Sequence, residues 1–137
     1  MKIVLVTTLG NKIIPSGIVS AVLTQTAEVA CDSLSIKIIG GKSLDEIERV
    51  YAYKNNKLIF NGYCDCQRTT ADERGFETYI YARSSACLLV DNDAFAYTYN
   101  RPSAQSLFDA YAKPFGFSYK LDDICTFFHS TVVAFYI

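Results

Sequence analysis

The chain has 137 residues, of which half are hydrophobic and a fifth are charged. A chain of this length forms one domain and buries a core without help from disulfides or metal ions. Its 13 basic and 14 acidic residues are well mixed and give a net charge of −1, so the basic stripe of a nucleic-acid-binding protein is missing. The N-terminal apolar run is too short for a secretion signal, and no run reaches the roughly 18 residues of a membrane span. We therefore expect neither nucleic acid nor membrane as a partner.

The first half of the chain predicts short antiparallel strands. Residues 3–8 and 12–14 flank the turn signal Gly10-Asn11 and predict a hairpin. Residues 18–25 predict the next strand. Residues 32–39 alternate between apolar and polar side chains, as is typical of a strand with one buried face. The apolar side chains of this strand are Leu34, Ile36 and Ile38.

The next segment predicts one helical turn and then a second hairpin. Residues 42–48 contain Ser43 and, three residues later, Glu46, which together resemble a capping box. Residues 49–54 and 57–66 have strand character, and Asn55-Asn56 between them predicts a tight turn because Asn tolerates positive φ. Residues 69–75 are polar and predict a loop.

The second half predicts further strands and one helix. Residues 76–83, 85–90 and 95–99 predict strands, followed by a helix that begins at Pro102 or Ser103 and ends near Lys113, with Gly116 closing it. Residues 117–121 and 131–137 predict the last strands. The predicted fold class is therefore mainly β (α+β). It is a single antiparallel barrel-like domain over residues 1–137, with one packed helix at about 102–113.

The five cysteines are the first candidates for chemistry. Their number is odd and no signal peptide is predicted, so reduced thiols in a cytosolic setting are expected. Cys64 and Cys66 are two residues apart, which in a regular strand places both on one face, where they could share a soft metal ion. A zinc site needs four ligands, however, and the single histidine, His129, is distant in the sequence. The simpler interpretation is that all are small buried or surface residues. The full set is Cys31, Cys64, Cys66, Cys87 and Cys125.

Catalytic motifs are missing from the sequence. It has no glycine-rich nucleotide loop, zinc-protease motif or hydrolase elbow. His129 lies in an aromatic segment and is more typical of a packed histidine than of a base. The acidic pairs Asp91/Asp93 and Asp122/Asp123 lie in predicted turns, where such residues are usually solvated. Gly40-Gly41 could form an anion nest, although a plain turn is the simpler interpretation. We predict no catalytic, cofactor-binding or metal-binding residue, and no enzyme activity.

Several segments, in this order, resemble one protein family. They are VSAVLTQ at residues 19–25, ACDSLSIKI at 30–38, NKLIFNGYCD at 56–65, the strand and LLVD at 79–91, and the helix ending in PFGF at 103–117. Together they resemble the N-terminal barrel region of phage tail hub proteins, the late-control-protein-D-like chains of the baseplate. The resemblance covers roughly residues 18 to 120. Members of that family are usually much longer, with a second related barrel, so we expect this chain to be a fragment or a truncated relative.

The resemblance implies a structural role in a phage or prophage tail. The implied assembly is a trimer whose ring closes the tail tube and joins it to the spike, without catalysis or cofactor. The implied location is the virion tail, after synthesis in the bacterial host cytoplasm. Two alternatives stay open at this point. One is a small metal- or redox-linked binding module that uses Cys64 and Cys66, and the other is a β-barrel that binds a ligand in its interior.

Overall fold

The structure is a computed structural model that describes residues 1–25, 29–73, 75–94 and 96–118. The chain divides into two units, Met1–Cys87 and Leu88–Ile137, and each is described by itself. No helix among the described residues is long and apolar enough to cross a membrane.

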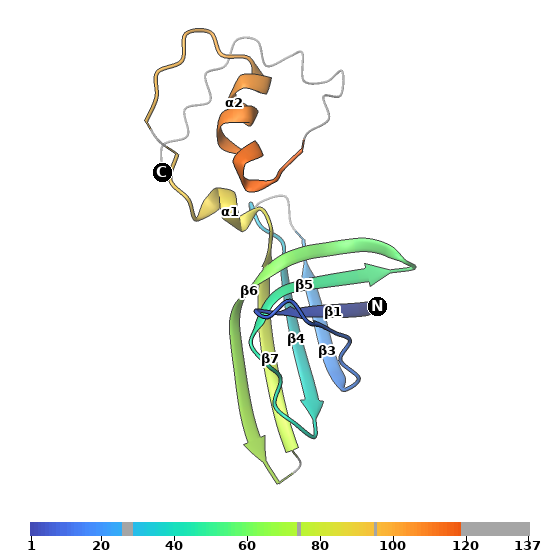
Figure 1. Cartoon of the computed structure of the whole chain (residues 1–137). Helices are drawn as coiled ribbons and strands as arrows, with labels where there is room; N and C mark the ends of the chain where they lie inside the picture. Colours follow the sequence, from blue (N-terminus) through green and yellow to red (C-terminus); the bar gives the residue numbers. More distant parts are fainter. Residues whose placement is uncertain (26–28, 74, 95, 119–137) are drawn as a thin grey trace. The chain divides into compact units, whose positions relative to one another are not determined.

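The first unit is one antiparallel sheet of seven strands (Figure 1). Each strand pairs with its sheet neighbours in antiparallel register. In spatial order the strands run β2-β1-β5-β6-β7-β4-β3. Their bounds are β1 Lys2–Thr7, β2 Lys12–Ile13, β3 Ile18–Thr24, β4 Ser33–Gly40, β5 Ile47–Lys54, β6 Lys57–Asp72 and β7 Gly75–Ser84.

The sheet must curl, because its two edge strands are neighbours in sequence. Only residues 14–17 separate β2 from β3, and an extended link of that size spans at most about 18 Å. A flat sheet of seven strands would hold its outer strands about 29 Å apart. The sheet therefore bends toward a barrel, although no pairing between β2 and β3 closes it within the described residues.

Strand β6 carries much of this bend. It pairs with β5 through residues 57–63 and with β7 through residues 62–72. Its register shifts between Cys64 and Cys66, so Asp65 is an extra residue opposite β7. A bulge of this kind bends a strand and increases its twist. Figure 1 shows β6 curving from its place beside β5 to its place beside β7, so a single strand serves both halves of the sheet.

The core lies on the inner face of the curled sheet. Strand β4 contributes the three apolar side chains expected from its alternation, and they pair with the inner face of β7, Ile36 opposite Ile80 and Leu34 opposite Ala82. The two buried threonines are satisfied, because the Thr78 and Thr69 hydroxyls lie 3.1 Å apart and the Asn11 N–H donates to Thr7 Oγ1. The cluster consists of Ile3, Leu5, Leu34, Ile36, Ile38, Ile47, Val50, Ala52, Phe60, Ile80 and Ala82.

The described part of the second unit is helical. Helix α1 spans Cys87–Val90, α2 spans Ala104–Tyr111, and a 3-10 turn, η1, spans Lys113–Phe115. Ser103 is the N-cap of α2, and its side chain accepts a hydrogen bond from the Ser106 N–H at 3.1 Å. Gly116 ends the segment with φ of +81°. The predicted helix and the mainly β fold class are both confirmed.

Four local predictions differ from the structure. Residues 42–46 form no helical turn, because tertiary contacts occupy their backbone groups: Gln67 donates to the carbonyl groups of Leu44 and Asp45, and Thr8 N–H donates to that of Glu46. Residues 69–72 continue β6 instead of forming a loop. Residues 87–90 are helical, with Asn92 Nδ2 donating to the Leu88 carbonyl at 2.6 Å.

The fourth difference is that residues 96–99 are not a strand. In the predicted strand 117–121, residues 117 and 118 are likewise not in a strand, and the rest lies outside the described residues. The predicted strand 131–137 also lies outside them.

Candidate interaction surfaces

The β6 bulge separates the two cysteines that the sequence places on one face. Cys64 lies opposite the buried Ala82, whereas Cys66 lies opposite Tyr81. Adjacent residues of a strand point to opposite faces, so Cys64 belongs to the inner face and Cys66 to the outer face. The prediction of a shared face is wrong because Asp65 is the extra residue of the bulge. Neither thiol forms a disulfide.

Cys64 is in a setting that suppresses its reactivity. It packs against the core cluster, and burial is the largest of the effects that raise the pKa of its thiol. The nearby carboxylates of Asp65 and Glu46 raise that pKa further. Since the thiolate is the reactive form and the metal-binding form, this environment opposes redox and metal chemistry at Cys64.

A shallow depression lies beside this pair. It is lined by Glu46, Ile47, Thr69 and residues 64–67. Both ends of the Gln67 side-chain amide form hydrogen bonds within the fold. Its oxygen accepts from the Ile47 N–H at 2.8 Å, and its nitrogen donates to the Asp45 carbonyl. Across the described ranges, no three His, Cys, Asp or Glu side chains form a group that could hold a metal ion.

The other sequence candidates are not brought together. Asp91 and Asp93 lie in an irregular segment after α1, and Gly40-Gly41 ends β4 beside the β6–β7 turn, where an added Gly75 Cβ would lie 2.7 Å from the Gly40 carbonyl oxygen. Gly40-Gly41 therefore serves a close backbone approach at a turn. Cys31 precedes β4 and Cys87 is buried at the start of α1. Asp122, Asp123, Cys125 and His129 lie outside the described residues.

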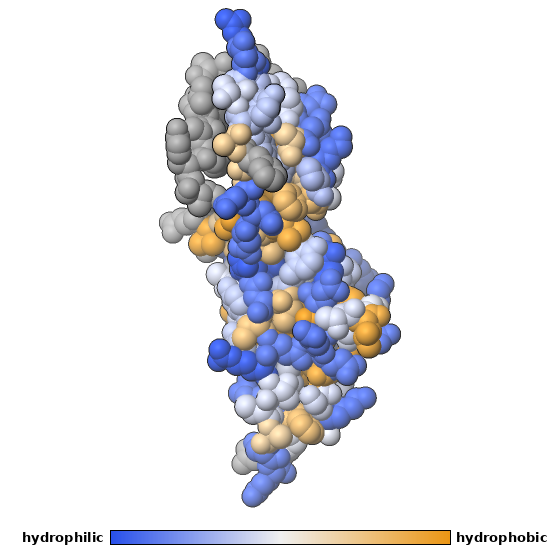
Figure 2. Space-filling view, turned by 60° about the vertical axis from the view of Figure 1, so that its left-hand side comes forward, coloured by the Kyte–Doolittle hydropathy of each residue, from blue (hydrophilic) through white to orange (hydrophobic). Residues whose placement is uncertain are grey.

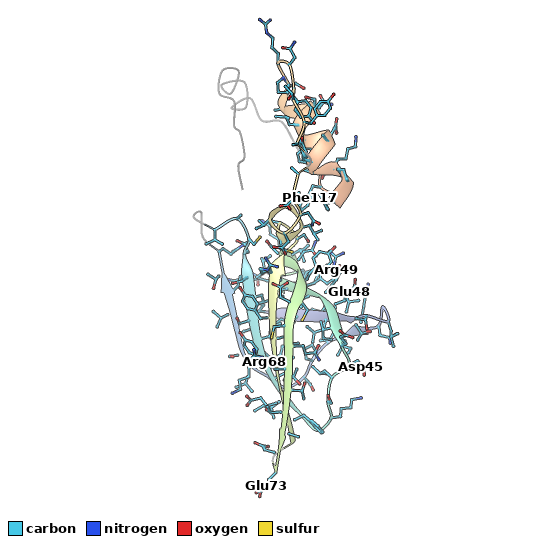
Figure 3. All side chains as sticks on the ribbon, turned by 90° about the vertical axis from the view of Figure 1, so that its left-hand side faces the viewer. Asp45, Glu48, Arg49, Arg68, Glu73 and Phe117 are labelled. Atoms are coloured by element: carbon cyan, nitrogen blue, oxygen red, sulfur yellow. The ribbon has the colours of Figure 1, made fainter. Side chains whose placement is uncertain are left out.

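The outer face of the sheet carries a cluster of one arginine and its aromatic neighbours. The Arg49 guanidinium lies 4.5 Å from the centre of the Tyr63 ring and 5.5 Å from that of Tyr51. Its Nη2 donates to Asn61 Oδ1 at 2.9 Å, while its Nε is buried with no hydrogen-bond partner in the described part of the chain. Figure 3 shows Arg49 beside Glu48 at the start of β5, far from Glu73 at the tip of the β6–β7 hairpin. Stacked Arg and Tyr side chains are typical of protein interfaces.

This cluster was not singled out from the sequence, although the signal is present. Arg49, Tyr51 and Tyr53 alternate along one strand, which places them on the same face. What the pattern cannot supply is the partner strand: the register of β5 with β6 sets Tyr63 directly opposite Arg49.

Two ion pairs lie on the same outer face. Arg83 pairs with Asp65 through its Nε, so the bulged residue is held by the neighbouring strand. Lys37 Nζ lies 2.9 Å from Glu77 Oε2 across β4 and β7. Figure 2 shows small apolar groups among polar and charged side chains over one face of this unit.

The two edges of the sheet differ in length and protection. Strand β2 has two residues and begins with Lys12, whereas β3 has seven residues with no charge and no proline. Val19 and Val22 of β3 are each 59% exposed. No strand of the described part of the chain pairs with this side of β3, and an open edge of this kind is a template for pairing with another strand.

The second unit presents a small aromatic ladder. The rings of Tyr97 and Tyr99 lie 4.9 Å apart, and those of Tyr99 and Tyr111 lie 6.1 Å apart, both edge to face. A hydrogen bond to Tyr111 is the main cause that raises the pKa of Tyr99. No residue of α2 is fully buried, and its partly buried residues are Leu107, Phe108, Asp109 and Tyr111.

The described residues thus form a curled antiparallel β-sheet with a mixed outer face and edge strands β2 and β3, and a small helical unit. No protein-family model and no curated protein matches the sequence. Among solved structures, the chain is similar to the 43 kDa tail protein of prophage MuSo2 from Shewanella oneidensis, with a TM-score of 0.67 and 19% sequence identity. The similarity covers 84% of this chain and 39% of the tail protein. The chain therefore matches well under half of that protein's length, and at this identity the likeness establishes the fold.

Proposed function

We propose that this chain is a structural, non-enzymatic component of a phage or prophage tail. The observation that carries the proposal is the fold likeness to a prophage tail protein over 84% of the chain. That likeness agrees with the order of segments 19–25, 30–38, 56–65, 79–91 and 103–117, which resembles tail hub proteins. The two lines of support are of different kinds, because one rests on backbone geometry and the other on residue patterns.

Within the tail, the proposed place is the baseplate hub, in the ring that closes the tail tube. The proposed partners are further copies of this chain, arranged as a trimer, together with tube and spike proteins. The supporting feature is the Arg49–Tyr63 cluster on the outer face. Arg and Tyr side chains are enriched where subunits contact each other.

Tail particles provide the direct test. The strain that encodes the chain is induced to produce tails, and the purified particles are analysed by quantitative mass spectrometry. We expect the chain in a fixed ratio to the tube protein, and we expect a deletion strain to yield unfinished tails. Normal, infective tails from the deletion strain would contradict the proposal.

The mass in solution tests the proposed trimer. Size-exclusion chromatography with light scattering, over a range of concentrations, is expected to show a trimer or an assembly of trimers. A mass that never reaches three copies would contradict the trimer without deciding whether the chain belongs to a tail, because the particle experiment decides that point separately.

The alternative function, a metal- or redox-linked module built on Cys64 and Cys66, has less support. The bulge at Asp65 places the two side chains on opposite faces of the sheet. We therefore propose no cofactor and no metal for this chain.

A further inference from the structure

Strand β3 is a long edge that the described part of the chain leaves open. It ends the sheet and pairs with β4 alone. Its register shifts between Ile18 and Ser20, and from Ser20 to Thr24 it is regular. Proteins usually protect such an edge with a charged residue, a proline, a bulge or a covering element. The bulge of β3 is confined to Val19, and residues 20–24 contain neither charge nor proline.

The ladder of hydrogen bonds shows which backbone groups of β3 point to the open side. The Ser84 N–H donates to the Asp32 carbonyl at 2.8 Å, and the Ile39 N–H donates to the Gly17 carbonyl at 2.8 Å. Because bonded pairs alternate in an antiparallel ladder, even-numbered residues of β4 bond to β7 and odd-numbered residues bond to β3.

The register of β3 with β4 shows in which direction the backbone groups of each β3 residue point. Val22 lies opposite Ser35, so the backbone groups of Val22 point to β4. Ala21 and Leu23, one residue to either side, direct their N–H and C=O groups to the open edge. Their side chains face the core, against which both are packed, while Val22 lies on the outer face with 59% of its side chain exposed.

We propose that β3 of a second copy of this chain pairs with this edge, antiparallel, about a two-fold axis at Val22. In this register Ala21 bonds to the partner subunit's Leu23 and Leu23 bonds to the partner subunit's Ala21. Val22 then lies opposite the partner subunit's Val22, as a pair without direct backbone hydrogen bonds. This contact goes beyond the proposed tail function and does not depend on it.

The side chains of β3 suit pairing with a second copy of the same strand. Cross-strand pairs on one face stabilise a sheet when they are apolar with apolar or hydroxyl with hydroxyl, and like charges oppose it. The two-fold register sets valine against valine and, on the same face, Ser20 against the partner subunit's Thr24. No charged side chain of β3 meets another, because the strand has none. A shift of one residue would turn the inner face of one strand outward.

Disulfide trapping tests the contact and its register. Val22→Cys is expected to give an oxidant-dependent dimer on a non-reducing gel, because Cα atoms in such a pair lie about 4.5 Å apart, within disulfide reach. Thr24→Cys is the register control: alone it should not cross-link, but mixed with Ser20→Cys it should. Ser35→Cys is the face control, since Ser35 lies on the outer face of β4, away from the edge. The native cysteines are present in every sample, and the unmodified chain sets their background.

A charge at the edge provides the second measurement. Val22→Lys is expected to halve the mass of the assembly in light scattering, because a two-fold contact joins its members in pairs and two lysines would then lie opposite each other. Leu58→Lys, at another exposed apolar residue, should leave the mass unchanged. Cross-linking of Val22→Cys no stronger than that of Ser35→Cys would overturn the proposal. An assembly whose mass is unaffected by Val22→Lys would also overturn it, while the tail function would still be decided by the particle experiment.

Discussion

At the scale of single residues, Gly62 shows how closely two strands approach. It is buried on β6, and an added Cβ would overlap the Arg83 carbonyl oxygen and lie 2.7 Å from Phe60 Cζ. A side chain there would push β6 and β7 apart or displace a core aromatic ring. The requirement at Gly62 is for space, because its backbone φ is not in the left-handed region.

We expect Gly62→Ala to lower the free energy of unfolding by about 2 kcal/mol, as overpacking in a well-packed core does. Gly41→Ala is the matched control, because its added Cβ would meet nothing within 4 Å and its φ is not positive. Urea denaturation followed by circular dichroism measures both variants. Equal stability of the two would show that β6 and β7 can separate at no cost.

The thiol of Cys64 makes the free energy of unfolding depend on pH. Burial raises the pKa of its thiol above the ordinary value of 9.0, so the folded state favours the neutral thiol. The resulting stability is complete below pH 9.0 and is lost as the pH rises through the folded pKa. We expect the fall in unfolding free energy above pH 9 to be less steep in Cys64→Ser than in the unmodified chain. Parallel pH curves for the variant and the unmodified chain would contradict the assignment.

At the scale of elements, the hairpins show what local sequence decides. Asn55 and Asn56 have φ of 50° and 61°, as the sequence predicts for a tight turn between two strands. The β4 alternation and the Ser103 cap of α2 are equally local and were equally predictable. Each depends on residues that are neighbours in the chain, so a short window of sequence contains the whole signal.

The Asn56 turn can be tested with two substitutions. Asn56→Ala should lower the free energy of unfolding by about 1 kcal/mol, because alanine lacks the short polar side chain that lets asparagine tolerate positive φ. Asn56→Gly should be neutral or slightly stabilising, because glycine adopts that φ without strain. Thermal denaturation of both variants, monitored at the same protein concentration, gives the comparison. A loss of stability in the glycine variant would mean that the Asn56 side chain matters more than its φ.

Other elements could not be predicted from a window. Residues 69–72 read as a loop because they are polar, yet they pair with β7 over the full length of the hairpin. Residues 42–46 carry a helix-capping pattern, but Gln67 and Thr8 occupy their backbone groups. The bulge at Asp65 has no sequence signature, since it arises from the joint register of β5, β6 and β7. In each case a residue from a distant strand decides the outcome.

At the scale of the whole molecule, the proposed assembly depends on surfaces of the sheet. The outer face carries an Arg–Tyr cluster and ion pairs, and within the described residues β3 has no second pairing strand. Loss of the cysteines distinguishes the proposed structural function from the metal- or redox-linked alternative. A structural subunit should tolerate the loss of its cysteines, whereas a metal- or redox-linked module should not.

We therefore expect the Cys64→Ser/Cys66→Ser double variant to keep the mass and elution volume of the unmodified chain, because neither thiol lies at the proposed β3 contact or in the Arg49 cluster. Light scattering measures the mass, and elemental analysis of the unmodified chain measures bound zinc in parallel. Stoichiometric zinc, or a change of assembly in the double variant, would favour the metal-linked function.

The sequence by itself determined the mainly β class, the alternation of β4, the Asn55-Asn56 turn and the presence of helix α2 after Ser103, because these depend on contacts between near neighbours. Only the tertiary structure decided that β2 and β3 end the same curled sheet, that Cys64 and Cys66 face opposite ways, and that Tyr63 lies opposite Arg49. The physical reason is register: a shift of one residue between strands exchanges the two faces of a sheet, and the register is set by all seven strands together.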